Sequence, residues 1–166
     1  MNKNLYQSCT IAGRSVSEFA YGADEVHPDC IALKLCLTNK IAELNAIGFM
    51  EFYANAEYGV SFFGAEAVIA LRDSLSIKLN IICPHEEMAN RYSREVRDRF
   101  FRLHELADSV QFVSRRFHDN CFRGADMYMI DNSDVLMTDC ADSFIARYAE
   151  KQGIQVELLD KLPLKL

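Results

Sequence analysis

The chain has 166 residues, 50% of them hydrophobic and 25% charged, a composition typical of one soluble globular domain. No apolar run approaches the roughly 18–20 residues that a membrane-spanning helix needs, so we expect no contact with a membrane. The formal net charge of −6 argues against broad, sequence-independent binding to nucleic acid, which depends on Lys and Arg neutralising phosphates.

Six cysteines are dispersed along the chain and lie mostly within apolar runs: Cys9, Cys30, Cys36, Cys83, Cys121 and Cys140. Reduced, buried thiols in a cytosolic protein explain this pattern better than a disulfide framework, which suits small secreted chains. The first residues also lack the apolar segment of a secretory signal. We therefore expect a cytoplasmic protein that forms a single domain over residues 1–166.

Short apolar runs alternate with longer amphipathic stretches along the chain. The apolar runs predict strands at Ser8–Gly13, Phe49–Ala54, Ile77–Cys83, Val110–Val113, Val135–Thr138 and Ile154–Leu159. The amphipathic stretches predict helices at Asp29–Ile47, Val60–Leu75, Arg91–Ala107, Cys121–Asn132 and Ala141–Gln152. Strands separated by helices of this length pair in parallel through right-handed crossovers. The expected fold class is α/β: a three-layer α/β/α sandwich with a Rossmann-like, mainly parallel sheet of five or six strands.

Several local features refine this prediction. The strands at Phe49–Ala54 and Ile77–Cys83 are almost continuously apolar, so both should be central or nearly central, with cover on both faces. We expect Asp29 to cap the first helix and Pro84 to end the third strand. On the second helix, the expected buried stripe consists of Val60, Phe63, Ala67, Leu71 and Leu75.

The turns at the carboxyl ends of the strands form the candidate site, because ligands of parallel sheets bind there. Glycine normally leaves room in such turns for a phosphate to reach backbone N–H groups. Only Gly13 and Gly59 stand where a strand passes into a helix, and Asn55 and Gly59 are the residues best able to adopt a positive φ. The expected ligand cleft comprises Gly13, Arg14, Asn55, Glu57, Gly59, Ser61, Glu66, Arg91, Thr138 and Asp139.

Three charged residues of this set have two interpretations each. Arg14 is either a guanidinium that grips phosphate in place of backbone groups or an exposed turn residue. Glu57 and Glu66 are either a carboxylate pair for acid–base work or metal binding, or carboxylates without a catalytic role. Because Glu57 would repel an anion, we favour a solvated carboxylate or a neutral or cationic ligand, and we predict no catalytic residue.

Two Cys/His pairs are weak candidates for metal ligands. Cys83 and His85 flank a proline, and His118 and Cys121 have a spacing that zinc can use. A zinc site normally provides three or four ligands, so we interpret these residues as core thiols and turn histidines and predict no metal.

Five stretches resemble the SLOG superfamily of Rossmann-like domains, in particular its YpsA-like branch, a domain of unknown function: Tyr21–Cys30, Gly59–Asp73, Ala89–Ser93, Asp108–Arg115 and Tyr128–Asp134. The resemblance extends from about Cys9 to Asp160. Such proteins usually carry T-G-H-R-P after the first strand and S-G-x-A-x-G-V-D after the second, where this chain has A-G-R-S-V and A-N-A-E-Y-G-V-S. The family's glycine-rich loop after the fifth strand is shorter here and contains no glycine.

Some SLOG relatives bind single-stranded DNA, which makes Arg91, Arg94, Arg115 and Arg116 a conceivable DNA groove. Against this, the arginines of the third helix have acidic neighbours at i,i+4 spacing, Glu95 with Arg99 and Asp98 with Arg102, and an aromatic platform is missing. We therefore interpret the run as a self-neutralised helix surface and expect no nucleic acid partner.

Three functions remain open. We prefer a non-catalytic ligand-sensing or vestigial nucleotide-binding domain, and we expect no cofactor. On this interpretation the protein is not expected to be an enzyme, although the residues alone do not decide the point. A hydrolase of nucleotide-like substrates is the alternative implied by phosphoribohydrolase relatives, although their P-G-G-x-G-T-x-x-E signature is absent here. The third is an oligomeric interaction scaffold.

Two further expectations concern partners. A small nucleotide-like ligand should bind only weakly if it is phosphorylated, because the glycine-poor turns and Glu57 disfavour an anion. A homodimer should bury at least one of Phe62 and Phe63, since adjacent helical residues point about 100° apart and cannot both face one sheet.

Overall fold

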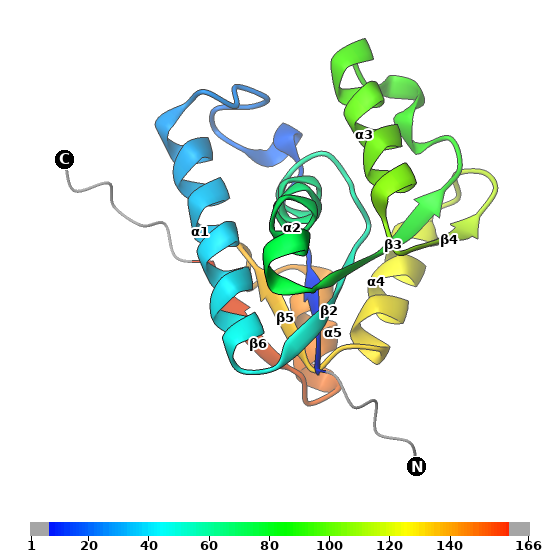
Figure 1. Ribbon diagram of the computed structural model, residues 1–166. Coiled ribbons are helices and arrows are strands. Elements are labelled where there is room, and N and C mark those ends of the chain that lie inside the picture. The colour runs from blue at the N-terminus through cyan, green and yellow to red at the C-terminus, as the bar shows by residue number, and fades with distance from the viewer. Residues whose placement is uncertain (1–6, 160–166) are drawn as a thin grey trace.

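A computed structural model describes residues 7–159 (Figure 1), so Asp160, where the family resemblance ends, lies outside the described residues. Six parallel strands form one sheet in the order β4-β3-β2-β1-β5-β6, which confirms the predicted α/β/α fold. The strands are β1 (Gln7–Ile11), β2 (Phe49–Ala54), β3 (Lys78–His85), β4 (Ser109–Ser114), β5 (Val135–Thr138) and β6 (Gln155–Leu158). The helices are α1 (Pro28–Ala46), α2 (Val60–Leu75), α3 (Arg94–Leu106), α4 (Cys121–Asp131) and α5 (Phe144–Lys151), with short 3-10 helices η1 (Val16–Glu18) and η2 (Met88–Arg91).

The helices cover both faces of the sheet. Figure 1 shows α1, α2 and α3 side by side on one face, while α4 and α5 pack together on the other. Adjacent residues of β3 illustrate the double cover, since Ile81 belongs to the core under α2 and Ile82 to the separate core under α4 and α5. Both are buried and both β2 and β3 have a strand on either side, as the continuous apolar runs predicted.

Strand order reverses between β1 and β5. The chain proceeds outward from β1 to β4 and then returns past β1 to add β5 and β6. In doubly wound sheets such a reversal opens a crevice at the carboxyl ends of the strands, where the chain segments diverge to opposite faces. The turns after β1, β2 and β5 therefore meet at one edge of the sheet.

Several element ends differ from the prediction, and serine caps explain two of them. The helix α3 begins at Arg94 because the Ser93 side chain accepts a hydrogen bond from the Val96 backbone N–H. Ser143 caps α5 in the same way, so that helix begins at Phe144 rather than near Ala141. The α1 N-cap is His27, not Asp29: its imidazole accepts the N–H of Asp29.

The strand β3 does not end at Pro84. It continues to His85, which pairs with Ser114 of β4. The neighbouring β2 has already ended at Ala54, which pairs with Ile81, so the last part of β3 has β4 alone beside it and tolerates a residue without an N–H there. The extension carries His85 beyond the end of β2.

Phe62 and Phe63 are both buried within the chain, with 0% and 3% of their surface exposed. The expectation that one of them is left for a dimer interface is therefore wrong. The first half of α2 is enclosed by α1, α3 and the sheet; a Cβ atom on Gly64 would collide with Ile11 of β1. Along the predicted stripe Val60 and Phe63 are buried, while Ala67, Leu71 and Leu75 are partly buried and pack against the same core.

Among residues 7–159 no helix is long and apolar enough to cross a membrane.

Candidate functional site

The turn between β2 and α2 uses its backbone donors internally. Ser61 Oγ accepts the N–H groups of Asn55 and Ala56 at 3.0 and 3.2 Å, and Asn55 Oδ1 accepts that of Glu57 at 2.9 Å. The N–H of Tyr58 donates to the Tyr92 hydroxyl at 3.1 Å. These donors lie in the turn that leads into α2, where a phosphate would approach, and each already has a partner.

The same turn is closed from outside by the segment after β1. Val60 N–H donates to the Arg14 carbonyl at 3.0 Å, and Val16 N–H donates to the Tyr58 carbonyl at 2.9 Å. Gly59 has φ 150°, and a Cβ atom there would collide with the Arg14 carbonyl, so only glycine fits. The second positive φ of the turn falls on Ala56, at 61°, and not on Asn55 as predicted.

A carboxylate of the protein fills the turn after β1. Asp139 follows β5, and its Oδ1 accepts the Arg14 N–H at 3.0 Å. A Cβ atom on Gly13 would collide with that oxygen, so the glycine allows Asp139 to approach. Burial raises the pKa of Asp139, although the backbone hydrogen bond and the charge of Arg14 lower it in part. The anion at this switch point is thus supplied by the chain itself.

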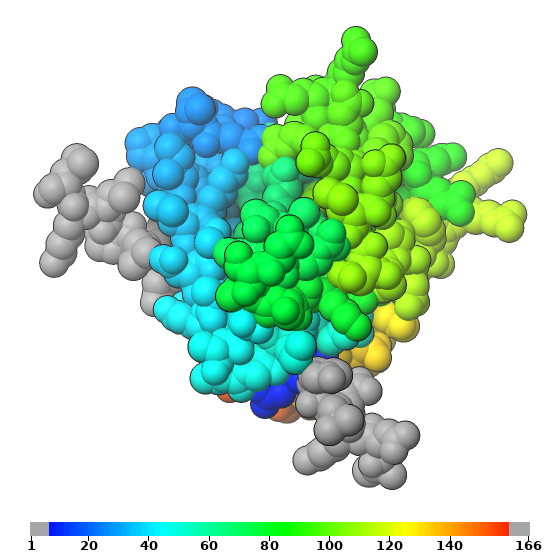
Figure 2. All heavy atoms as spheres, in the orientation of Figure 1, coloured from blue at the N-terminus to red at the C-terminus, as the bar shows by residue number. Residues whose placement is uncertain are grey.

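A cleft of about 1100 Å³ opens beside these filled turns. One wall is the segment from Ser15 to Val26, the opposite wall is η2 with the first turn of α3, and Glu57 and Tyr58 lie between them. Figure 2 shows the recess at the top of the molecule, between the blue segment before α1 and the green segment around α3. Three ring side chains, His85, Phe117 and Phe122, line its end.

Glu57 lines the cleft between its two walls. It is half-buried, and burial raises its pKa to about 7, with a further contribution from Glu18 of η1. Burial also raises the pKa of Asp126 on α4 to about 7, and the charge of Glu57 adds to this shift. These carboxyl groups therefore exchange protons near neutral pH, far above their ordinary range.

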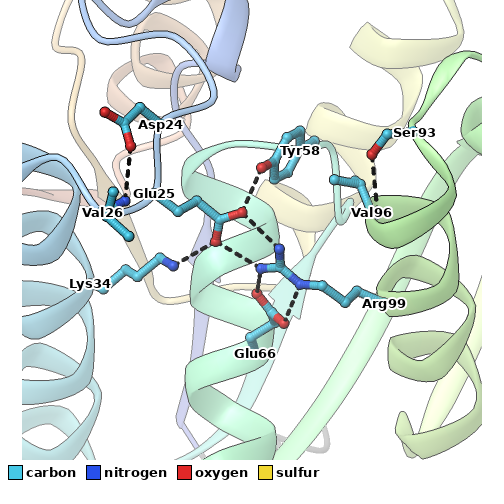
Figure 3. Close-up of polar contacts among 9 residues, drawn as sticks. All are labelled: Asp24, Glu25, Val26, Lys34, Tyr58, Glu66, Ser93, Val96 and Arg99. Carbon is cyan, nitrogen blue, oxygen red and sulfur yellow. Dashed lines mark hydrogen bonds and ion pairs between the residues drawn. The ribbon is translucent and has the colours of Figure 1, made fainter.

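A network centred on Glu25 joins the two walls of the cleft. Arg99 of α3 holds the Glu25 carboxylate through two contacts of 2.7 and 2.9 Å. Lys34 of α1 and the Tyr58 hydroxyl each donate to it at 2.6 Å (Figure 3). Burial alone would raise the pKa of Glu25, but these hydrogen bonds lower it to about 2. We call Glu25, Lys34, Tyr58, Arg99 and Glu66 the Glu25 clamp.

Glu66 belongs to this clamp and is not a partner of Glu57. Arg99 donates to both Glu66 oxygens, at 2.6 and 3.2 Å, and its guanidinium lies 5.0 Å from the Phe62 ring centre. The predicted local pairing of the α3 arginines is wrong, because Arg99 reaches Glu25 and Glu66 instead of Glu95. Within the described part of α3 no ion pair joins Asp98 to Arg102 either.

His85 stands at the end of the extended β3 strand with 9% of its surface exposed. Its ring makes edge contacts with Phe117 and Phe122, at centroid distances of 5.7 and 6.0 Å. Its Nδ1 atom is shielded from solvent and has no hydrogen-bond partner among residues 7–159. Buried imidazole nitrogens usually have a partner, which makes this one notable in a cleft wall.

Of the ten residues predicted from sequence, Glu57 and Arg91 line the cleft, whereas Glu66 lines a separate pocket beside Arg99. Thr138 is buried and accepts the Cys140 N–H through its hydroxyl. Ligand binding by the others stays a prediction. Sequence reasoning missed several other residues that line the cleft. Asp24, Glu25 and Tyr92 lie within stretches that carry the family resemblance, which was the available signal; Tyr58, Phe117 and Phe122 lie outside them.

The chain is similar to UPF0398 proteins of two bacteria. A UPF0398 protein of Macrococcus caseolyticus is 26% identical over 109 residues, which are 64% of this chain and 60% of that protein. A UPF0398 protein of Staphylococcus epidermidis is 24% identical over 137 residues, 81% of this chain and 73% of that protein. The match therefore spans less than two thirds of the Macrococcus relative.

The fold has a solved counterpart in DNA processing protein A from Helicobacter pylori, a structure concerned with a single-stranded DNA binding mode. The TM-score is 0.60 at 14% identity, and the match covers 90% of this chain and 63% of that one, so the likeness is one of fold. A family model described as the YspA SLOG family matches residues 9–152. This match covers most of the chain and confirms the resemblance seen in the sequence: the protein belongs to the YspA SLOG family.

Proposed function

We propose that this protein is a non-catalytic ligand-sensing domain whose cleft, between residues 15–26 and the η2–α3 segment, binds a small molecule without a phosphate group. The observation that carries the proposal is the state of the β2–α2 turn. Its donors at Asn55, Ala56, Glu57, Tyr58 and Val60 all hydrogen-bond to the protein itself. A phosphate would have to displace these bonds and approach Glu57.

Energetics support this choice. One charge-assisted hydrogen bond from Arg14 would contribute about 1.5–3 kcal/mol. Micromolar binding needs about 8 kcal/mol, which relatives with open glycine-rich turns would obtain from several converging N–H groups. Asp139 already takes the backbone donor of Arg14 and adds a negative charge beside it.

Two alternatives have less support. A hydrolase of nucleotide-like substrates would need a carboxylate aimed at a bound ribose, but Glu66 is engaged by Arg99 and Asp139 by the β1 turn. An oligomeric scaffold would leave the cleft and its clamp without a purpose. Neither accounts for a partly buried charge network that holds the two walls of one cleft.

Calorimetry with AMP, ADP-ribose and NAD tests the proposal against adenosine as an unphosphorylated control. We expect millimolar or no affinity for the three phosphorylated compounds. Ser17→Trp fills the cleft from its rim, so it should abolish thermal stabilisation by any unphosphorylated ligand, whereas Ser74→Trp on the exposed end of α2 should not. Micromolar binding of a nucleotide that Arg14→Ala abolishes would overturn the proposal.

Single-stranded nucleic acid is a second candidate ligand, favoured by one specific observation. Arg115 and Arg116 are exposed on the β4–α4 connection next to Phe117, whose ring is 61% exposed. An exposed aromatic ring beside two guanidinium groups can act as a stacking platform, and base stacking contributes about 1–3 kcal/mol per base. The Helicobacter pylori structure with the same fold concerns single-stranded DNA binding.

Fluorescence anisotropy with a labelled oligothymidylate tests this second candidate. If it is correct, the double variant Arg115→Ala/Arg116→Ala binds at least tenfold more weakly and has a smaller dependence on salt. Arg147→Ala removes an exposed arginine of α5 and should change nothing. Equal binding by all three proteins, or none at 50 mM salt, would exclude this surface.

A further inference from the structure

We infer that the ligand of the cleft is an organic cation, a protonated or quaternary amine. The inference rests on the proposed function and names the ligand class. It starts from the charges on the walls: Asp24, Glu57, Glu87 and Glu95 face the cleft against the single guanidinium of Arg91. None of the four carboxylates has an ion-pair partner among the described residues.

These carboxylates are spread around the cleft and do not converge. Within residues 7–159 no group of three or more acidic, cysteine or histidine side chains is placed to hold a metal ion. A dispersed negative field in a partly enclosed space attracts a bulky cation without requiring coordination geometry. The fifth carboxylate, Glu25, is already neutralised by Arg99 and Lys34, so it shapes the wall and adds little to this field.

Aromatic rings supply the second part of such a site. Tyr58 and Tyr92 contact each other edge to face at 6.1 Å on one side of the cleft, and Phe117 and Phe122 lie against His85 at its end. Ring faces attract ammonium groups through their quadrupole. The protein already uses this contact just behind the cleft, where Lys34 lies 4.6 Å from the Phe63 ring centre.

His85 provides an observation independent of the acidic residues. Its side chain lines the cleft, is about nine-tenths buried, and leaves Nδ1 without a hydrogen-bond partner among the described residues. The unpartnered nitrogen can accept a hydrogen bond, and a protonated amine brings an N–H donor for it. The unpartnered atom therefore fits a protonated amine, while a quaternary amine would rely on the carboxylates and the rings alone.

Binding should be coupled to the charge of Glu57. The groups facing it are Glu18 of η1, Asp126 of α4, Tyr92 before α3 and, across the cleft, Arg91 and the acidic rim. Burial, with a further contribution from the charge of Glu18, raises the pKa of Glu57 to about 7, so Glu57 gains its charge as the pH rises through neutrality. A cation in the cleft favours that ionised form and expels a proton.

The test is isothermal titration of the whole protein with choline and spermidine in 150 mM NaCl. The control ligand is 3,3-dimethylbutan-1-ol, which has the shape of choline without its charge. We expect saturable binding of at least one cation and none of the neutral isostere. Affinity should rise at least about threefold from pH 6 to pH 8, because Glu57 ionises in that range.

Variants distinguish binding in the cleft from non-specific attraction of a cation to the negatively charged protein. Glu57→Gln should remove the pH dependence and Phe117→Ala should weaken the cation at least fivefold, while Glu150→Gln, on the exposed side of α5, should do neither. Phe117 is exposed, so its removal tests the site even if Glu57→Gln unfolds the protein.

The outcomes test the organic-cation ligand and the proposed sensing function separately. Absence of heat with both cations at 10 mM, or equal binding of choline and its isostere, overturns the inference. If adenosine binds instead and Ser17→Trp abolishes that binding, the proposed function stands without the inference. Micromolar binding of AMP would overturn the proposed function itself.

Discussion

Glu57 shows how one side chain links the stability of the protein to its site. Burial raises its pKa from 4.5 to about 7, and Asp126 is raised to a similar value. A carboxyl group with a higher pKa in the folded state makes that state bind more protons than the unfolded chain. Glu57 therefore contributes most to the stability of the folded state below about pH 4.5. This contribution decreases as the pH rises from 4.5 to 7 and is absent at higher pH.

We predict that Glu57→Gln stabilises the protein at pH 8 by about 1–2 kcal/mol and has almost no effect at pH 4. The reason is that glutamine removes a charge that the folded state must hold in a partly buried place. Urea denaturation at the two pH values measures the difference. Glu150→Gln is the exposed control, and an equal effect of Glu57→Gln at both pH values would contradict the argument.

At the scale of elements, the Glu25 clamp ties the segment before α1 to three other parts of the fold. Lys34 lies on α1, Tyr58 in the β2–α2 turn and Arg99 on α3, and all three donate to the same carboxylate. The pKa of Glu25 is lowered to about 2, so its ionised form stabilises the folded state. That stabilisation is present above about pH 4.5 and is lost as the pH falls toward 2.

Glu25→Gln should lower the free energy of unfolding at pH 7 by about 1–3 kcal/mol, because Arg99 and Lys34 lose a shared, partly buried partner. The deficit should shrink as the pH is lowered from 4.5 toward 2. Hydrogen exchange adds a local measure: residues 16–27 should lose protection before the sheet does. Glu86→Gln alters an exposed carboxylate beside the cleft, and the same loss in that variant would argue against a clamp.

For the whole molecule, the exposed aromatic rings indicate where two copies of the chain would meet. Phe62 and Phe63 are covered within the chain, so they cannot provide the expected dimer contact. The largest exposed rings instead gather near the β4 edge of the sheet, on α3, β4 and the loop that follows: Phe101, Phe112 and Phe117. The strand β4 contains no charged residue and no proline, which are the residues that usually prevent an edge strand from pairing with another chain.

A homo-oligomer stays a prediction, now placed at this edge. Light scattering at about 100 μM should give the mass of a dimer, and Phe112→Lys should convert it to a monomer because a charged side chain disfavours pairing of exposed edges. Phe144→Lys changes a half-buried ring on the opposite side of the sheet and serves as the comparison. A monomeric wild-type protein at this concentration would refute the prediction.

Some elements could be predicted to the residue. The bounds of β2, α2 and β5 agree with the apolar runs at Phe49–Ala54, Val60–Leu75 and Val135–Thr138. Other ends were missed, because a serine cap such as Ser93 is recognised only once its side chain meets the helix. The end of β3 depends on where β2 stops, which is a property of the sheet and not of the segment itself.

The sequence by itself determined the fold class, because hydrophobic periodicity is a local property that decides which faces must be buried. It also determined that the phosphate-binding turns are altered, since glycine is either present or absent there. Only the tertiary structure decided that Arg99 binds Glu25 and Glu66 instead of Glu95, and that the Tyr92 hydroxyl fills the turn at Tyr58. Side chains choose partners by distance in the folded chain, and residues 33 or 74 positions apart meet only after the helices have packed on the sheet.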